Sequence, residues 1–373
     1  MNVLYIIHST INGGATISFK SLIEGIIGHG VKPIIVYPKR QYNDTIKYFE
    51  SIGCDCYSSF ITLSIIPDKV VFLKKILIVF KNILFKIISL INLLCIAKKV
   101  KPDIIHTNTG VVHEGYSVAK LLKIPHVWHI REYQTKDFNW SIFPSKKSFE
   151  NRLSKSFGIF ITKELQQYFN QDNNTSKVIY NPIFDLEDVT AVHYSTTEKY
   201  FLIANRISPE KGIEDIIKGY ALFCNNNCEY GLKIAGFGEE TYIAQLKQLC
   251  KELNILDKVH FVGYVSDMRE LIYNAKVLFV GSYYEAFGRM TAEANLMGTF
   301  VIGRNSGGTK EILELTNGGS LFDKYEEIPS LLECYLNTNG DIMERSKLIA
   351  LKYFTKKNHC EIVFHVYKEV TNK

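Results

Sequence analysis

Short apolar runs, each followed by a stretch with helical periodicity, recur along the whole chain, and this alternation limits the fold more than any other feature. It is typical of βαβ units, in which parallel strands lie buried beneath helices. The strands expected in the first half of the chain are Val3–His8, Lys32–Tyr37, Asp103–His106 and His126–Ile130. Those expected in the second half are Tyr200–Ala204, Gly231–Ala235, Val259–Phe261, Val277–Val280 and Phe300–Gly303. The pattern therefore predicts an α/β protein with parallel sheets.

The alternation breaks once, near the middle of the chain. Ile179–Thr190 contains Asn181-Pro182 and a cluster of acidic residues, which favours an interdomain linker. A chain of 373 residues, 46% of them hydrophobic, is long enough for two domains that each bury a core. We expect a first domain at residues 1–182, a second at residues 183–352, and a terminal helix at residues 353–370 with the option of packing back on the first domain. An active site would then lie in the cleft between the two domains.

Two features of the sequence favour a cytoplasmic location. The eight cysteines lack the spacing of zinc sites, and we expect them to be reduced thiols. The apolar run Val3–Ile7 is too short for a signal peptide and has no positive charge before it, so we expect no export.

The segment Val70–Ala97 is almost wholly Ile, Leu, Val and Phe, interrupted by lysines. Its longest uncharged run, Ile87–Ala97, is 11 residues long, whereas a span needs about 20, so we do not expect it to cross a bilayer. Two alternatives stay open: an amphipathic helix in the headgroup region of an anionic membrane, or a core-facing helix pair with solvated lysines. Residues 1–185 hold 23 Lys and Arg against 13 Asp and Glu, a net charge of +10, which favours the membrane.

Two glutamates, Glu285 and Glu293, follow the expected strand Val277–Val280. If a helix begins near Gly288, its free N–H groups and positive dipole end can bind a phosphate. Glu293 would then lie about one turn further along, where its carboxylate can accept from both hydroxyls of a ribose, and Glu285 would face a sugar. In isolation, such a pair is more often a solvated loop acid and a salt-bridged surface residue.

Two basic residues, Arg206 and Lys211, follow the expected strand Tyr200–Ala204. Because ligands bind outside the carboxyl ends of parallel strands, these cations should meet the same cleft as the two glutamates. Fixed cations in a dry cleft stabilise the charge that develops on a diphosphate leaving group. The sequence offers no Asp-x-Asp element for Mg²⁺ or Mn²⁺, and we predict no metal. Taken alone, the two cations would more often be ordinary surface charges.

Arg206 with Lys211-Gly212, followed by Glu285-x7-Glu293, resembles the donor site of retaining glycosyltransferase family 4. The resemblance covers nearly the whole chain. It implies the GT-B fold, in which two Rossmann-like domains with parallel sheets face a central cleft. It also implies that the first domain binds the acceptor and the second domain binds a nucleotide-sugar donor.

The resemblance assigns roles to individual residues. Arg206 and Lys211 would stabilise the leaving diphosphate, and Glu293 would hold the ribose. Glu285 would orient the sugar together with the backbone amides of Phe287 and Gly288.

Several glycine-rich segments also fall in the family's order. Gly13 and Gly14 resemble its first glycine loop, which approaches the donor phosphate or the acceptor, although a plain tight turn is the alternative. Tyr264 and Val265 resemble the segment that meets the nucleotide base. The remaining glycines are expected to serve backbone geometry; they lie in Gly236-Phe237-Gly238-Glu239, Ser306-Gly307-Gly308-Thr309-Lys310-Glu311 and Gly318-Gly319.

His129 is the catalytic candidate of the first domain. Trp128-His129-Ile130-Arg131-Glu132 resembles the His-x-Arg-Glu variant of the family's first-domain histidine, which lies near the transferred sugar. An imidazole with a pKa near neutrality can serve in either charge state. We expect His106, also at a strand end, to be only a hydrogen-bonded boundary residue.

The resemblance implies a metal-independent, retaining sugar transfer in which the departing phosphate oxygen takes the acceptor proton. We expect a UDP-sugar as donor, no cofactor and no nucleic-acid partner. The expected acceptor is a saccharide, lipid-linked, in cell-surface polysaccharide synthesis, with the protein peripheral on the inner face of the cell membrane. A nucleotide-sugar epimerase of the same fold and a non-catalytic nucleotide-sugar-binding scaffold are the alternatives.

Overall fold

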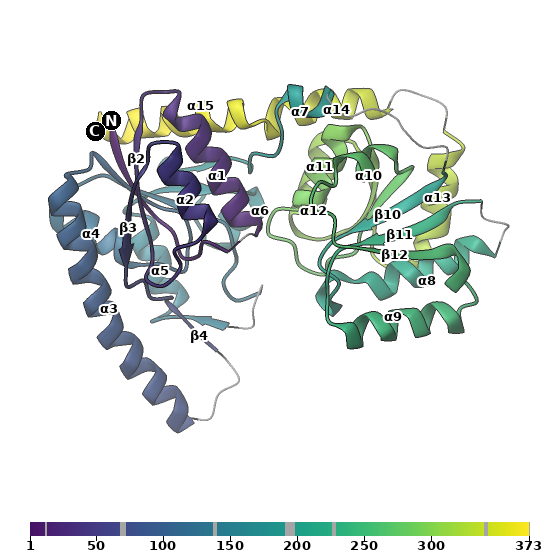
Figure 1. Ribbon diagram of the computed structural model, residues 1–373, viewed down its shortest axis with the longest axis horizontal. Helices are drawn as coiled ribbons and strands as arrows, with labels where there is room; N and C mark the ends of the chain where they lie inside the picture. Colours follow the sequence, from purple (N-terminus) through teal and green to yellow (C-terminus); the bar gives the residue numbers. More distant parts are fainter. Residues whose placement is uncertain are drawn as a thin grey trace. The chain divides into compact units, whose positions relative to one another are not determined.

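The computed structural model (Figure 1) describes residues 1–11, 13–67, 72–136, 140–190, 198–225, 229–338 and 342–372, with the backbone alone at 72–75. Asn12, Val70, Val71 and Cys228 lie outside these residues. The seven described cysteines form no disulfide with one another. The chain forms two compact units, Met1–Pro182 with Lys356–Lys373, and Ile183–Thr355.

The first unit is built on a sheet of seven strands in which all neighbours run parallel, in the order β3-β2-β1-β5-β6-β8-β9. The strands are β1 (Asn2–Ile6), β2 (Lys32–Pro38), β3 (Asp55–Ser59), β5 (Ile104–Thr107), β6 (His126–Ile130), β8 (Phe157–Phe160) and β9 (Ser176–Val178). The helices between them are α1 (Gly14–Ile27), α2 (Asp44–Ser51), α3 (Phe72–Val100), α4 (Glu114–Leu122), α5 (Lys146–Leu153) and α6 (Lys163–Tyr168). A short antiparallel pair is formed by β4 (Ile65–Pro67) and β7 (Trp140–Ile142).

Alternate residues of β1 enter two separate cores. Val3 and Tyr5 pack against α1 on one face of the sheet, whereas Leu4 and Ile6 pack with α3 and α4 on the other. Because successive side chains of a strand point to opposite faces, a strand covered by helices on both sides must be apolar at every position. This is the physical origin of the continuous apolar runs in the sequence.

Helix α15 (Lys356–Thr371) belongs to the first unit, although α14 (Ile342–Phe354) belongs to the second. A Cβ on Gly25 of α1 would lie 2.4 Å from the Cys360 Sγ atom, so the two helices pack with close backbones. The Tyr367 hydroxyl lies 2.6 Å from His106 Nδ1 and 3.0 Å from the Tyr5 hydroxyl. The expected single helix over 353–370 is thus divided at residue 355.

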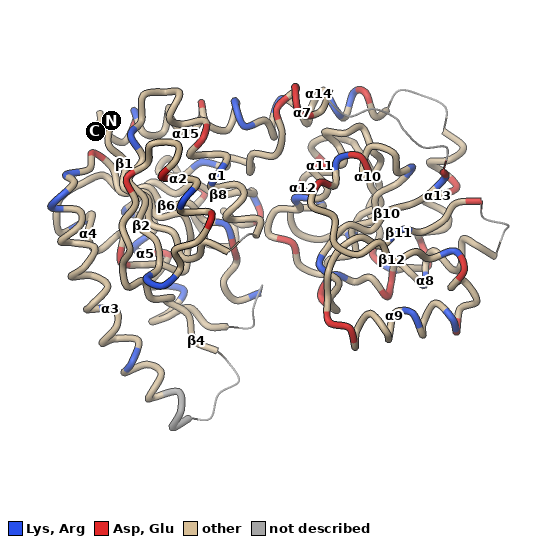
Figure 2. The backbone as a smooth tube through the Cα atoms, in the orientation of Figure 1, with Lys and Arg blue, Asp and Glu red and all other residues tan. Residues whose placement is uncertain are grey.

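Helix α3 is one helix of 29 residues and not a helix pair. Its stretch Ile76–Val100 is long and apolar enough to cross a membrane by length and composition, with a mean hydropathy of 2.0 and only 11% of its most apolar part buried. The prediction that this segment does not cross a bilayer, which relied on the length of its longest uncharged run, is therefore not supported. Among its described side chains, Leu93 and Ala97 in the C-terminal part are the apolar ones buried in the core. Figure 2 shows few charged positions along α3.

The second unit is built on a parallel sheet of six strands in the order β12-β11-β10-β13-β14-β15. The strands are β10 (Tyr200–Ala204), β11 (Gly231–Ala235), β12 (Val259–Gly263), β13 (Val277–Val280), β14 (Phe300–Arg304) and β15 (Gly319–Phe322). Its helices are α7 (Leu186–Thr190), α8 (Ile213–Cys224), α9 (Glu240–Glu252), α10 (Arg269–Asn274), α11 (Arg289–Met297), α12 (Gly307–Thr316), α13 (Ile328–Leu336) and α14. The strand order reverses between β10 and β13, and the loops at such a switch point are where α/β sheets bind ligands.

The Tyr367 hydroxyl offers a test of how α15 is held. Tyr367→Phe should lower the free energy of unfolding by about 1–3 kcal/mol, because His106 Nδ1 and the Tyr5 hydroxyl lose a buried partner. Urea unfolding followed by circular dichroism measures the change. The control is Tyr284→Phe, whose side chain is 63% exposed and whose effect should stay below about 0.5 kcal/mol. Equal effects of the two variants would contradict the role given to Tyr367.

Candidate functional site

The loops that follow β10 and β13 touch each other at the switch point of the second sheet. Gly212 has a φ of +60°, and a Cβ there would lie 2.1 Å from the Gly281 carbonyl oxygen. The Tyr283 N–H donates to the Glu210 carbonyl oxygen at 3.1 Å. Glycine at position 212 is required both by the left-handed backbone and by the lack of space. These contacts bring residues 206–212 beside residues 281–288.

The structure brings Lys211 and Glu285 together from these two loops. Lys211 Nζ lies 3.0 Å from Glu285 Oε2, and the two side chains are 19% and 22% exposed. Because the pair is partly shielded from water, its attraction exceeds that of a freely exposed pair. Residues 74 positions apart in the sequence thus form one polar group at the mouth of the sheet.

Arg206 lies on the more exposed rim of the same loop. Its guanidinium forms an ion pair with Glu210, and the Ser208 hydroxyl donates to Glu210 Oε1 at 2.7 Å. The side chains of Arg206 and Glu210 are more than half exposed. Glu210 was not singled out from the sequence, because a spacing of four residues indicates a pair within an α-helix, whereas this segment is a loop that leads into the 3₁₀ helix Pro209–Lys211.

Two helices begin beside residues 285–288. Gly288 precedes α11 with a φ of +87°, and Gly307 opens α12 with a φ of +54°. The Gly308 N–H donates to the Glu285 carbonyl oxygen at 2.7 Å, and a Cβ on Gly308 would lie 1.9 Å from the carbonyl oxygen of Phe287. The Phe287 ring is buried. Two positive dipole ends therefore face one loop, as in anion sites.

Glu293 is in the second turn of α11, and its side chain is buried rather than exposed to solvent. It is 6% exposed, and Arg289 Nε donates to its Oε1 at 2.7 Å. Burial raises the pKa of Glu293, and the charge and hydrogen bond of Arg289 oppose that shift. Arg289, which the sequence analysis missed, is one turn before Glu293, so an i,i+4 rule applied to the motif could have found it. A ribose at Glu293 would share the carboxylate with this arginine.

Two exposed aromatic rings follow β11 and β12. Phe237 and Tyr264 are 61% and 72% exposed, and their ring centroids lie 6.2 Å apart. The Gly236 N–H donates to the Gly263 carbonyl oxygen at 2.8 Å, which holds the two loops together. Val265 is half-buried. The Phe237 ring was not predicted, because the glycines of the Gly236–Glu239 turn indicate only a backbone role.

In the first unit, Gly13 and Gly14 lie at the start of α1. Gly13 is extended, with a φ of −163°, and a Cβ on Gly14 would meet no atom within 4 Å. Packing among the described residues therefore does not require glycine at position 14. The backbone amides of the first turn of α1 are the polar groups that this end of the helix offers.

His129 is completely buried at the end of β6. Its ring centroid lies 5.5 Å from that of His106 and 6.0 Å from that of His359. Arg131 Nη2 donates to His129 Nδ1 at 3.3 Å, which assigns the ring proton to Nε2. Burial, reinforced by the charge of Arg131, lowers the pKa of His129 well below 6.5. This favours a neutral imidazole near pH 7, and the role expected of His129 beside the transferred sugar stays a prediction.

The residues after His129 organise the loop that follows β5. Arg131 Nε and Nη2 each lie 3.1 Å from the Asn108 Oδ1 atom. Glu132 Oε1 accepts from the Thr109 hydroxyl at 2.6 Å and from the Gly110 N–H at 2.8 Å. The His-x-Arg-Glu segment thus binds one loop to the next, a structural role that the sequence analysis did not foresee.

Comparison with known proteins bears mainly on the second unit, where Lys211, Glu285 and the two helix starts lie. Residues 188–347 match the family model of glycosyl transferases group 1. The matched range contains Arg206, Glu293 and both exposed aromatic rings as well.

Two curated relatives are similar to parts of the chain. An uncharacterized glycosyltransferase of Methanocaldococcus jannaschii is 27% identical over 238 residues, which cover 57% of this chain and 60% of that protein. Mannosylfructose-phosphate synthase of Agrobacterium fabrum is 35% identical over 132 residues, which cover 32% of this chain and 29% of the synthase. The chain therefore spans less than two thirds of the length of these relatives.

A solved structure covers the whole fold. HepE of Anabaena, in complex with UDP, superposes with a TM-score of 0.77 at 17% identity, over 99% of this chain and 100% of that one. The predicted GT-B architecture of two Rossmann-like domains with parallel sheets is confirmed.

The buried histidines of the first unit predict acid sensitivity. Burial lowers the pKa of His126 and His359 to about 3, and those of His106 and His129 also lie well below 6.5. Below pH 6.5 the unfolded chain therefore binds more protons than the folded chain, so stability is complete above that pH and is lost as the pH falls toward 3.

Each such histidine should cost about 1.4 kcal/mol of unfolding free energy per pH unit across that window. Melting temperatures from pH 7.5 to pH 5 measure the loss. His126→Asn should make the melting temperature depend less on pH. The control is Ser9→Ala, a change at a half-exposed residue without a titratable group, which should leave the pH dependence unchanged. A melting temperature that is constant across this range would refute the neutral assignment.

Proposed function

We propose that the protein is a metal-independent, retaining glycosyltransferase that moves a sugar from a UDP-sugar to a saccharide acceptor. The observation that carries this proposal is the contact between Lys211 and Glu285 beside the starts of α11 and α12, within the range that matches glycosyl transferases group 1. Such a loop presents cations, backbone N–H groups and a carboxylate together. A nucleotide diphosphate joined to a sugar needs all three.

The diphosphate would be held by Lys211, Arg206 and the first amides of α11. Both cations already have carboxylate partners, Glu285 and Glu210. The exposed pair of Arg206 with Glu210 contributes only about 0–1 kcal/mol, so a diphosphate with two negative charges can compete for Arg206. The more shielded Lys211 would exchange one carboxylate for the two negative charges of the diphosphate. The amides near Gly288 add charge stabilisation that needs no rearrangement.

The nucleoside and the sugar would lie on either side of this diphosphate. The exposed rings of Phe237 and Tyr264, with Val265, are our candidates for the base, and the UDP and UDP-glucose complexes of HepE support uracil. Glu293 would accept from the ribose hydroxyls. Glu285, released from Lys211, would orient the sugar with the amides of Phe287 and Gly288.

The proposed transfer needs no protein nucleophile. The bond between the anomeric carbon and the phosphate oxygen breaks, and the acceptor hydroxyl forms its bond on the same face of the sugar. The acceptor proton goes to the departing phosphate oxygen. Lys211 and Arg206 stabilise the charge on that diphosphate, which is the transition-state contribution expected of fixed cations.

We assign acceptor binding to the first domain and donor binding to the second, with His129 acting on the sugar side as a neutral Nε2–H donor. The acceptor in this proposal is a lipid-linked saccharide of cell-surface polysaccharide synthesis. The exposed apolar part of α3 and the net charge of +10 over residues 1–185 support a peripheral position on the inner face of the membrane.

Lys211→Ala and Glu293→Ala should each lower kcat by about 10²- to 10³-fold, because each removes a group that binds the donor in the transition state. Transfer from radiolabelled UDP-sugars to lipid extracts measures turnover. Lys251→Ala on α9 is the matched control, since Lys251 is exposed in the same unit. Near-normal turnover in both site variants would retire the assignment.

UDP should raise the melting temperature by mass action, and more than GDP or ADP does. Phe237→Ala and Tyr264→Ala should each weaken UDP binding by about 2- to 10-fold, because an aromatic contact contributes roughly 0.5–1.5 kcal/mol. Titration calorimetry measures the affinities, with Phe223→Leu, a conservative change on the packed helix α8, as the control.

Incubation of the protein with the donor and no acceptor separates the transferase from the alternative epimerase. Interconversion of the sugar would indicate an epimerase, and slow hydrolysis of the donor would fit a transferase.

A further inference from the structure

Helix α3 carries an apolar stripe that no described residue covers. Its members recur every three or four positions and are 46–73% exposed; they are Ile76, Phe80, Ile83, Leu84, Ile87 and Ile91. At a rise of about 1.5 Å per residue, the stripe is roughly 23 Å long. Soluble proteins rarely expose a contiguous apolar surface of this extent, and such surfaces mark sites that contact a protein or a membrane.

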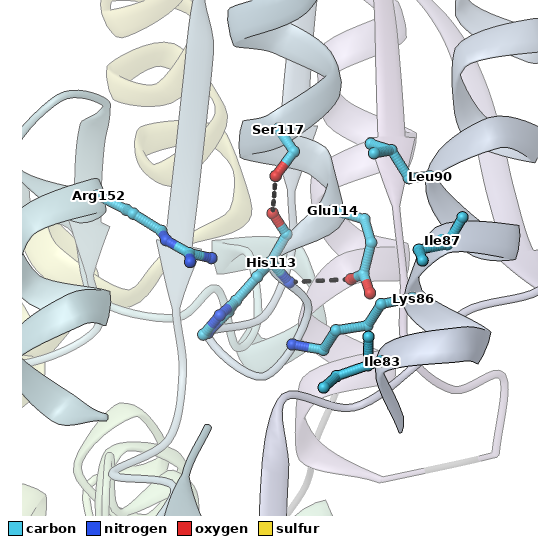
Figure 3. A pocket seen from close by; sticks show the side chains of 8 residues that line it. All are labelled: Ile83, Lys86, Ile87, Leu90, His113, Glu114, Ser117 and Arg152. Atoms are coloured by element: carbon cyan, nitrogen blue, oxygen red, sulfur yellow. Dashed lines mark hydrogen bonds between the residues drawn. The ribbon is translucent and has the colours of Figure 1, made fainter. Parts of the chain in front are cut away.

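A cavity of about 200 Å³ opens beside this stripe, between α3 and the segments that carry His113 and Arg152 (Figure 3). Ile83 and Ile87 belong to both the stripe and the cavity wall. The apolar stripe and the cavity are therefore one continuous surface.

Two cations point into this cavity from opposite sides of His113 (Figure 3). Lys86 Nζ donates to the Ser64 hydroxyl at 2.7 Å and has two further protons to donate. Arg152 has no carboxylate within ion-pair distance among the residues that the structure describes. An anion in the cavity would give Arg152 an ionic partner and would accept one of the remaining protons of Lys86.

The cavity also contains one carboxylate, Glu114, whose oxygens are already engaged. The Thr62 hydroxyl donates to its Oε1, and the His113 N–H donates to its Oε2 at 3.1 Å. Burial raises the pKa of Glu114, whereas its hydrogen bonds and the charge of Lys86 act to lower it. Even with Glu114 ionised, Lys86 and Arg152 leave the cavity with a net positive charge.

A second cavity on α3, of about 460 Å³, shows the contrast. Phe60, Ile78, Phe85 and Trp140 contribute to its walls, and the described residues that line it include no Lys or Arg. Two cations lie outside that lining, with Lys39 Nζ 4.9 Å from the Phe60 ring centroid and Lys81 Nζ 5.6 Å from the Phe85 ring centroid. The cavity next to the stripe differs in that two cations, Lys86 and Arg152, are themselves part of its lining.

We propose that the cavity between Lys86 and Arg152 binds the phosphate of an anionic membrane phospholipid while the α3 stripe lies among the acyl chains. The apolar stripe, roughly 23 Å long at about 1.5 Å per residue, would contact the acyl chains of a phospholipid. The cationic cavity beside the stripe would bind the phosphate of the headgroup. The sequence of the first unit holds 27 Lys and Arg against 14 Asp and Glu, so long-range attraction acts in the same direction. This inference deepens the peripheral location within the proposed function.

Flotation of the full chain with vesicles tests the proposal. Binding to vesicles of phosphatidylcholine with phosphatidylglycerol should exceed binding to phosphatidylcholine alone by at least about fivefold, the effect of even one cation near an anionic surface. Lys86→Gln and Arg152→Gln should each remove more than that factor. Lys81→Gln is the matched control, because Lys81 is an exposed cation on the same helix outside the cavity. Phe80→Ser should weaken binding to both kinds of vesicle.

Three results would overturn the proposal. Equal losses for Lys81→Gln, Lys86→Gln and Arg152→Gln would mean diffuse attraction and no phosphate site. Inorganic phosphate that raises the melting temperature as much as anionic vesicles do would mean a site for free phosphate. A dimer that Phe80→Ser dissociates, without vesicle binding, would mean that a second copy covers the stripe.

The outcome is separable from the proposed transferase function. Lys86 and Arg152 lie in the first unit, whereas the proposed UDP site lies in the second. Circular dichroism and the UDP-induced rise in melting temperature should therefore be unchanged in all four variants. Vesicle binding without any response to UDP would overturn the transferase proposal and leave the lipid site standing.

Discussion

The arrangement of the second unit depends on the close approach of two backbone segments at its switch point. Gly212 and Gly281 leave no space for a side chain between the loops after β10 and β13. Without that approach, Lys211 could not reach Glu285, and the starts of α11 and α12 would not border the same loop. Because these two glycines have no Cβ, the two loops can approach closely, and this approach brings the charged side chains of the site together.

The charges of the site are balanced before any ligand is considered. Lys211 pairs with Glu285, Arg206 with Glu210, and Arg289 with Glu293, so each cation is held in place by a carboxylate. Such pairing orients long side chains that would otherwise lose rotamer freedom on binding. It also means that an incoming anion must displace carboxylates as well as water. In the first unit the buried Arg131 is held differently, by the neutral His129 ring and by the amide oxygen of Asn108.

The sequence predicted those features that depend on patterns local to the chain. Strands buried on both faces, such as β6 and β10, appear as apolar runs and were predicted, although the buried β8, only four residues long, was not. The edge strands β3 and β9 are polar, have no such run and were not predicted. The start of α11 at Gly288 was found because glycine and the motif mark it. The pairing of Arg289 with Glu293 and the burial of His129 were not, because they depend on packing that spacing does not reveal.

The return of α15 to the first unit has a consequence for synthesis of the chain. Tyr5 and Gly25 emerge from the ribosome early, yet the residues that cover them, Tyr367 and Cys360, are made more than 300 positions later. During translation the surface of α1 that α15 covers is therefore open to chaperones and to other nascent chains. The first unit completes its core only after the second has been synthesised, so the unit that begins first is the last to finish folding.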